Sequence, residues 1–252
     1  MAANDNTRVE LGWRIFGLGI VAFAVIGFIW ADFISGQPAP KWLPERTAFA
    51  YAAAAFMLVT GAALQWRRTV HWAATALVLY YGVIVLLLEN GRVIFKNYNV
   101  YGAYSGAAEP LAITAAAVIV YAATANRDAA RAARLTRIAQ LAFGVAAVLF
   151  GLAHFFYMEY TAPLIPKWLP PNQVFWGYAT GAFHIMAGAA ILTGIQARLG
   201  ALLAAAMYAL FIPLVFVPLL QTEPTSFRWT ELVTTVVLIG VALTVAESFK
   251  RR

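Results

Sequence analysis

Cysteine is absent from the 252-residue sequence, and charged side chains make up only 12% of it. Without cysteine the chain can form no disulfide, no thiolate-bound zinc or iron–sulfur centre and no thiol nucleophile. A soluble domain carries about 25% charged residues, so too few charges remain here to cover a surface that faces water. Hydrophobic residues account for 62% of the chain, and the mean hydropathy is +0.73. These values exclude disorder and predict a polytopic membrane protein.

Long apolar runs predict how often the chain crosses the bilayer. A hydrocarbon core of about 30 Å requires about 20 apolar residues per helix. Eight such runs occur, at about 13–31, 47–65, 69–88, 106–124, 137–157, 174–193, 198–220 and 230–248. The first is longer than the apolar region of a signal peptide, and the acidic residues Asp5 and Glu10 stand at its start. We therefore expect an all-α fold with eight transmembrane helices.

Basic residues are unevenly divided between the two sides of the predicted membrane. If the N-terminus is cytoplasmic, twelve Lys and Arg residues lie on that side and six on the other, as the positive-inside rule requires. The cytoplasmic set is Arg8, Arg14, Arg67, Arg68, Arg127, Arg131, Arg134, Arg137, Arg198, Lys250, Arg251 and Arg252. The sequence thus predicts a bacterial or archaeal plasma membrane protein with both termini in the cytoplasm. Topology and contact with the lipid bilayer explain the net charge of +7, so we expect no nucleic acid as a partner.

A five-residue motif indicates that the chain is duplicated. The sequence Pro-Lys-Trp-Leu-Pro at residues 40–44 recurs at residues 166–170. Each unit has four spans, so both insert in the same orientation, as parallel four-helix-bundle repeats related by an axis along the membrane normal. We expect a first unit at 1–125, a basic cytoplasmic linker at 126–136 and a second unit at 137–252. The motif is expected to form an external turn, with a re-entrant segment as the alternative.

Small residues and a histidine share one face of each of the fifth and sixth spans. The helical spacing places Gly144, Gly151 and His154 together on one span, and Gly177, Gly181, His184 and Gly188 on the other. Small residues at this spacing mark close approach of helices in a membrane. Aligning the two units places Met57 opposite His184 and Trp30 opposite His154. Only the second unit carries these histidines, so we expect a single active site there.

Ionisable side chains within spans are costly and indicate function. His154 lies about 5 Å below the outer end of its span and His184 about 15 Å, a difference that argues against a shared metal ion or haem. Glu231 lies at a depth similar to that of His154, so we expect these two to be a catalytic, proton-handling pair. His184 is expected to be a deeper polar contact of the same catalytic site, and no metal is expected. Tyr157, Trp176 and Gly181 are the residues expected to contact a cofactor.

Structural roles are the alternatives for these residues. His184 would then only donate a hydrogen bond to a carbonyl of a neighbouring helix. Glu231, and its repeat counterpart Glu109, would stand at the beginning of their spans, where the helix dipole stabilises a carboxylate.

The second half of the chain resembles the DoxX-like membrane proteins. The resemblance rests on Gly151-Leu152-Ala153-His154-Phe155-Phe156, on the Trp-Leu-Pro loop, and on the Gly181–Gly188 segment with its central His184. The first half resembles a diverged copy without either histidine. The family is similar to the small membrane subunit of archaeal thiosulfate:quinone oxidoreductase. The resemblance therefore implies a membrane component of a quinone-linked redox system, with a quinone as cofactor and redox subunits as partners.

Two other functions stay open at this point. A small-molecule carrier would use a path between the units, but Pro213 and Pro218 in the seventh span have no counterparts in the third. A non-catalytic assembly or anchoring subunit would use the histidines only to hold helices together.

Overall fold

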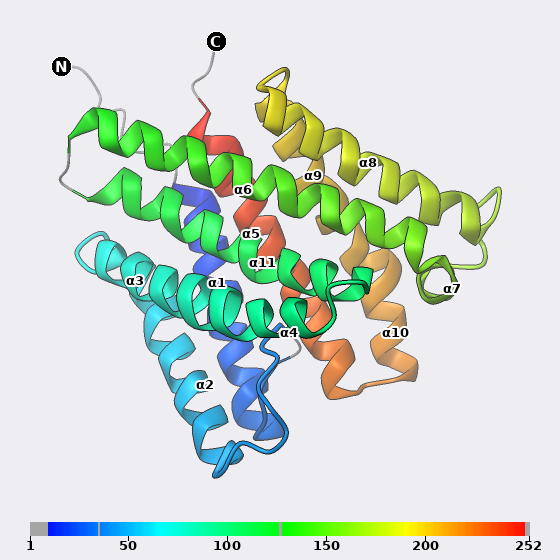
Figure 1. The fold of residues 1–252 in the computed structure, drawn as a ribbon. Coiled ribbons are helices and arrows are strands. Elements are labelled where there is room, and N and C mark those ends of the chain that lie inside the picture. The colour runs from blue at the N-terminus through cyan, green and yellow to red at the C-terminus, as the bar shows by residue number, and fades with distance from the viewer. Residues whose placement is uncertain (1–9, 35, 126–127, 250–252) are drawn as a thin grey trace.

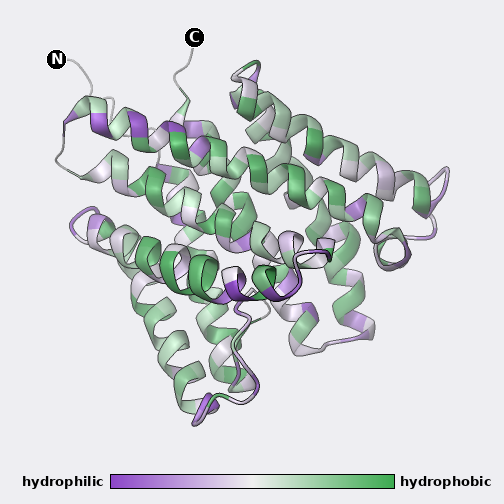
Figure 2. Cartoon of the chain, in the orientation of Figure 1, coloured by the Kyte–Doolittle hydropathy of each residue, from purple (hydrophilic) through white to green (hydrophobic). Residues whose placement is uncertain are grey.

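The structure, a computed structural model, describes residues 10–34, 36–125 and 128–249. Over these residues it is all-helical, and eight helices are long and apolar enough to cross a membrane, which confirms an all-α polytopic membrane protein (Figure 1). Hydrophobic residues run along the helices (Figure 2). The spans are α1 (Glu10–Trp30), α2 (Arg46–Ala63), α3–η2–α4 (Val70–Leu77, Val78–Asn90, Gly91–Lys96), α5 (Tyr101–Thr124), α6 (Ala129–Phe156), α8 (Gln173–Thr193), α9–η4–α10 (Ala197–Phe211, Ile212–Phe216, Val217–Thr222) and α11 (Ser226–Ser248). Two short helices, α7 (Met158–Thr161) and η3 (Ala162–Leu164), lie between α6 and α8.

Helix packing in the first four spans is repeated in the last four. The first helix of each half packs on the second, α1 on α2 and α6 on α8, and the third packs on the fourth. The first helix of each half also packs closely on the fourth helix of the other half, α1 on α11 and α6 on α5. Helices α5 and α11 contact each other at the centre (Figure 1). The two units therefore interlock through α5 and α11.

Close approach of α1 to α2, and of α6 to α8, depends on glycines at equivalent positions. A Cβ on Gly61 would lie 2.7 Å from the carbonyl oxygen of Gly17, and a Cβ on Gly188 would lie 2.7 Å from that of Gly144. Gly17 and Gly144 are the same number of residues apart as Gly61 and Gly188. The glycine contacts of the two units are therefore related by one constant shift in residue number.

Most of the predicted basic linker is helical. Helix α6 begins at Ala129, and the side chain of Asp128 accepts a hydrogen bond from the main-chain nitrogen of Arg131 at 3.1 Å. Alanine, arginine and leucine favour helix, so helix α6 begins within the residues that were expected to form a linker. Of the basic residues predicted on the cytoplasmic side, Arg8, Arg127, Lys250, Arg251 and Arg252 lie outside the described residues.

The repeated Pro-Lys-Trp-Leu-Pro motif forms the expected turn in both units. The main-chain nitrogen of Leu43 donates to the carbonyl of Pro40 at 3.2 Å, and that of Leu169 donates to the carbonyl of Pro166 at 3.1 Å. In the first unit, Arg46 fixes this loop by donating to the carbonyl oxygens of Ala39 and Pro40.

The third and seventh spans both contain a π-helical segment. Val78–Asn90 is π-helical in the third span and Ile212–Phe216 in the seventh, at corresponding places in the two units. Pro213 and Pro218 have no counterparts in the third span, but the π-helical segment around Pro213 does have one. Proline removes a main-chain donor, but the third span adopts its π segment without any proline, so proline is not the shared cause.

Candidate functional site

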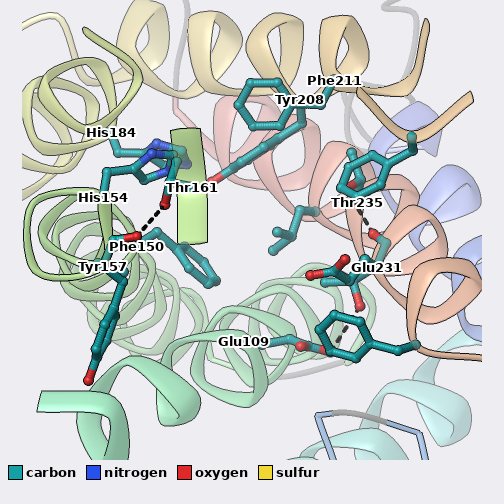
Figure 3. A pocket seen from close by; sticks show the side chains of 15 residues that line it. Glu109, Phe150, His154, Tyr157, Thr161, His184, Tyr208, Phe211, Glu231 and Thr235 are labelled. Carbon is teal, nitrogen blue, oxygen red and sulfur yellow. Dashed lines mark hydrogen bonds between the residues drawn. The ribbon is translucent and has the colours of Figure 1, made fainter. Parts of the chain in front are cut away.

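A cavity of about 340 Å³ lies between α5, α6, α8, α9, η4 and α11. Its volume is within the range of small-molecule binding sites, about 300–1,000 Å³. Aromatic rings form much of its wall, from Phe150, Tyr208, Phe211, Phe216 and Phe227. The polar side chains that line it include Glu109, His154, His184 and Glu231, whereas the hydroxyl of Tyr157 is directed away from it (Figure 3). The cavity therefore combines flat apolar walls with several groups able to exchange protons.

The two histidines are neighbours, contrary to the expectation from their depths. The ring centroids of His154 and His184 are 5.4 Å apart. Side chains lean toward the N-terminus of their helix, and α6 and α8 run in opposite directions. The His154 ring therefore leans toward the beginning of α6 and the His184 ring toward the beginning of α8, so the two rings lean toward each other. Among the described residues, however, no group of three or more His, Asp or Glu side chains is arranged to hold a metal ion.

His184 is enclosed by aromatic rings and is only 3% exposed. Its ring centroid lies 5.4 Å from that of Tyr208 and 6.1 Å from that of Phe150. Its Nδ1 is 3.0 Å from the carbonyl oxygen of Thr180, one turn earlier in the same helix. A carbonyl only accepts, so Nδ1 carries the proton and Nε2 is an acceptor. The bond is within α8, so His184 does not join two helices in the way the structural alternative supposed.

His154 and Glu231 lie on opposite sides of the cavity rather than in contact (Figure 3). The carboxylate of Glu231 instead accepts a hydrogen bond from Arg228 at 3.0 Å, and Arg228 also pairs with the exposed Glu223. Glu109 lies on the same side as Glu231 and accepts a hydrogen bond from Thr234 at 3.4 Å. The two histidines therefore face two carboxylates across the cavity.

Neither glutamate caps its helix. Helix α5 begins at Tyr101, well before Glu109, and the N-cap of α11 is Thr225, whose side chain accepts from the main-chain nitrogen of Arg228 at 3.3 Å. The capping alternative was therefore wrong. Each span begins earlier than the apolar runs indicated, and this places both carboxylates inside the bundle.

The residues expected to contact a cofactor fall in three different places. Tyr157 lines the cavity. Gly181 lies behind it, where a Cβ would be 2.8 Å from the Cβ of His154, so this glycine lets the histidine pack against α8. Trp176 is not among the residues of the cavity wall, and its Nε1 donates to the carbonyl oxygen of Pro170 at 2.7 Å. Its observed contact fixes the loop before α8.

Tyr208 is a cavity residue that was not predicted from the sequence. It is 2% exposed, and its hydroxyl has no hydrogen-bond partner among the described residues. The Nδ1 atom of His154 is also buried, and none of the residues that the structure describes gives it a hydrogen bond. Tyr208 could have been identified from the sequence, because it is a tyrosine within an apolar span and Tyr81 stands at the equivalent position of the first unit.

The first unit has residues equivalent to His154, His184 and Tyr208. The shift in residue number between the paired glycines also pairs Gly27 with His154, Met57 with His184 and Tyr81 with Tyr208. A Cβ on Gly27 would meet that of Ala54 at 3.0 Å, just as His154 meets Gly181 in the second unit. The position opposite His154 is therefore Gly27, and the expectation of Trp30 there was wrong.

The fold and the cavity define a polytopic helical membrane protein with a pocket formed by its second half together with Glu109 of α5. Residues 141–246 match a family model described as a domain of unknown function (DUF8561). No curated protein and no solved structure matches the chain. The matched segment lies within residues 137–252 and includes both histidines, Tyr208 and Glu231, whereas Glu109 precedes it.

Proposed function

We propose that the protein is the quinone-binding membrane component of a redox system and that it handles protons near the external face of a bacterial or archaeal plasma membrane. The observation that carries the proposal is the cavity in which His154 and His184 face Glu109 and Glu231 between aromatic walls. Reduction of a quinone takes up two electrons and two protons. Imidazole and carboxylate groups are suited to deliver the protons, and a partner subunit would supply the electrons.

The cavity fits a quinone headgroup in shape and in chemistry. A flat ring would pack against Phe150 and Phe211, because aromatic rings favour stacked or edge-to-face contact. The buried Nδ1 of His154 and the hydroxyl of Tyr208 have no hydrogen-bond partner in the part of the chain that the structure describes, and either is able to bond a ring oxygen. The resemblance to DoxX-like proteins points to the same chemistry.

Binding of decylubiquinone to the purified protein in mild detergent tests this proposal. Isothermal titration calorimetry should show saturable binding, and His154→Gln should weaken it at least about fivefold through loss of one hydrogen bond. The control is His71→Gln, because His71 lies in α3, outside the cavity, and stacks on Tyr121 with centroids 5.1 Å apart. Absence of saturable binding to the unaltered protein would overturn the proposal.

A small-molecule carrier is the second candidate, and the paired π segments favour it. π-Helical segments frequently occur at functional sites, and here they stand at corresponding places in the two repeats. Here Phe216 of the Ile212–Phe216 segment lines the cavity. A carrier would expose the cavity to each side of the membrane in turn, whereas the quinone site proposed above opens only near the external face.

A further inference from the structure

The hydroxyl of Tyr208 is buried next to the cavity and has no hydrogen-bond partner within residues 10–34, 36–125 and 128–249. This hydroxyl is directed toward the imidazoles of His154 and His184 (Figure 3), and the rings of Tyr208 and His184 are 5.4 Å apart. No described residue gives the hydroxyl a hydrogen bond. Buried hydroxyl groups in folded proteins nearly always have a partner, so a bonding group from outside the chain is indicated.

The equivalent tyrosine of the first unit does have a partner. The hydroxyl of Tyr81 donates to the sulfur of Met57 at 3.5 Å, at the position that His184 occupies in the second unit. The same space receives the side chain of Gln37, which is 6% exposed and comes from the loop between α1 and α2. Its Nε2 lies 2.9 Å from the hydroxyl of Tyr80 and 3.6 Å from the sulfur of Met57.

The loop of the first unit thus fills its own interior with a polar side chain. Arg46 and Arg92 hold this loop by donating to the carbonyls of Pro40 and Pro38. Three residues before the repeated motif, where the first unit has Gln37, the second unit has Pro163, and neither Pro163 nor the adjacent Leu164 lines the cavity. The interior of the second unit is therefore left free for a molecule that is not part of the chain.

We propose that the second unit binds one ligand per chain at the place equivalent to that of Gln37, and that the hydroxyl of Tyr208 donates a hydrogen bond to a carbonyl oxygen of this ligand. The ligand is a planar ring with a carbonyl at its edge. A carbonyl oxygen has two lone pairs, so this oxygen is able to accept a second hydrogen bond beside that of Tyr208. This inference rests on the proposed function and adds the residue that selects for the carbonyl.

The test compares Tyr208→Phe with the matched control Tyr81→Phe. Calorimetric titration with decylubiquinone in mild detergent should give one site per chain. Tyr208→Phe should bind about tenfold more weakly than the unaltered protein, because the phenyl ring keeps the shape and loses only the donor. Tyr81→Phe should bind as the unaltered protein does.

Stability without quinone gives a second readout. Tyr208→Phe should keep or raise the unfolding midpoint, because it removes an unpartnered hydroxyl, whereas Tyr81→Phe should lower it through loss of the bond to Met57. Equal quinone affinity of Tyr208→Phe and the unaltered protein would overturn this inference while leaving the proposed function intact. No binding to the unaltered protein would overturn the proposed function, and this inference with it.

Discussion

Replacing His184 by methionine would give the second unit the residue that the first unit has at the same place. Methionine has nearly the volume of histidine and adapts to aromatic surroundings. In the first unit Met57 accepts from the hydroxyl of Tyr81. In His184→Met the new thioether should therefore offer the unpartnered hydroxyl of Tyr208 an acceptor.

The free energies of the lost and gained contacts nearly cancel. The substitution removes the hydrogen bond from Nδ1 to the carbonyl of Thr180, worth about 0.5–1.5 kcal/mol, and a ring contact worth about 0.5–1.5 kcal/mol. It gains a sulfur–aromatic contact of about 0.3–1.5 kcal/mol. It also gives the hydroxyl of Tyr208 an acceptor, which is worth about 1 kcal/mol or more. We expect a net change in unfolding free energy within about 1 kcal/mol. His184→Ala, which leaves a void among the rings, should cost about 2–4 kcal/mol.

Reversible unfolding in mixed detergent micelles, followed by far-ultraviolet circular dichroism, measures both variants against the unaltered protein. His184→Met should unfold close to the unaltered protein, and His184→Ala should unfold well before it. If the methionine variant is as unstable as the alanine variant, the equivalence of Met57 and His184 is refuted.

Two predictions separate the proposed role of the cavity from its alternatives. Glu231→Gln should slow quinone reduction at least about tenfold in membranes that contain the partner proteins, because a proton donor is lost. Glu223→Gln should leave the rate unchanged, since Glu223 also pairs with Arg228 but does not line the cavity; equal slowing by both would assign the effect to Arg228. Thr234→Cys places the only thiol of the chain in the cavity wall, where a membrane-impermeant maleimide should label it from the external side alone. Labelling from either side would favour the carrier.

The spans and the repeat could be predicted from the sequence because both depend on local patterns. Apolar runs of membrane length and the identical Pro-Lys-Trp-Leu-Pro turns are readable without any knowledge of packing. The helix ends were less accurate, since polar residues extend several helices beyond their apolar runs. This is why Glu109 and Glu231 were expected at helix ends and lie inside the bundle instead.

The arrangement of the cavity could not be predicted, because it depends on how helices lean and cross. The positions of His154 and His184 along their helices predicted that the two rings lie at different depths. Side chains on antiparallel helices lean toward each other, however, and this brings the rings together. No residue preference indicated the π segment at Val78–Asn90. The insertion of Gln37 into the first unit depends on the path of a loop, which hydropathy does not describe.

Photolabelling with an azido-quinone, mapped by mass spectrometry of peptides, tests most directly whether the second unit holds the binding site. The described cavity predicts label on peptides from α8 and α9, which carry His184 and Tyr208. An excess of decylubiquinone should abolish this label, and Tyr208→Phe should reduce it. Label on α2 and the third span around Met57 and Tyr81, or label that resists competition, would contradict the account.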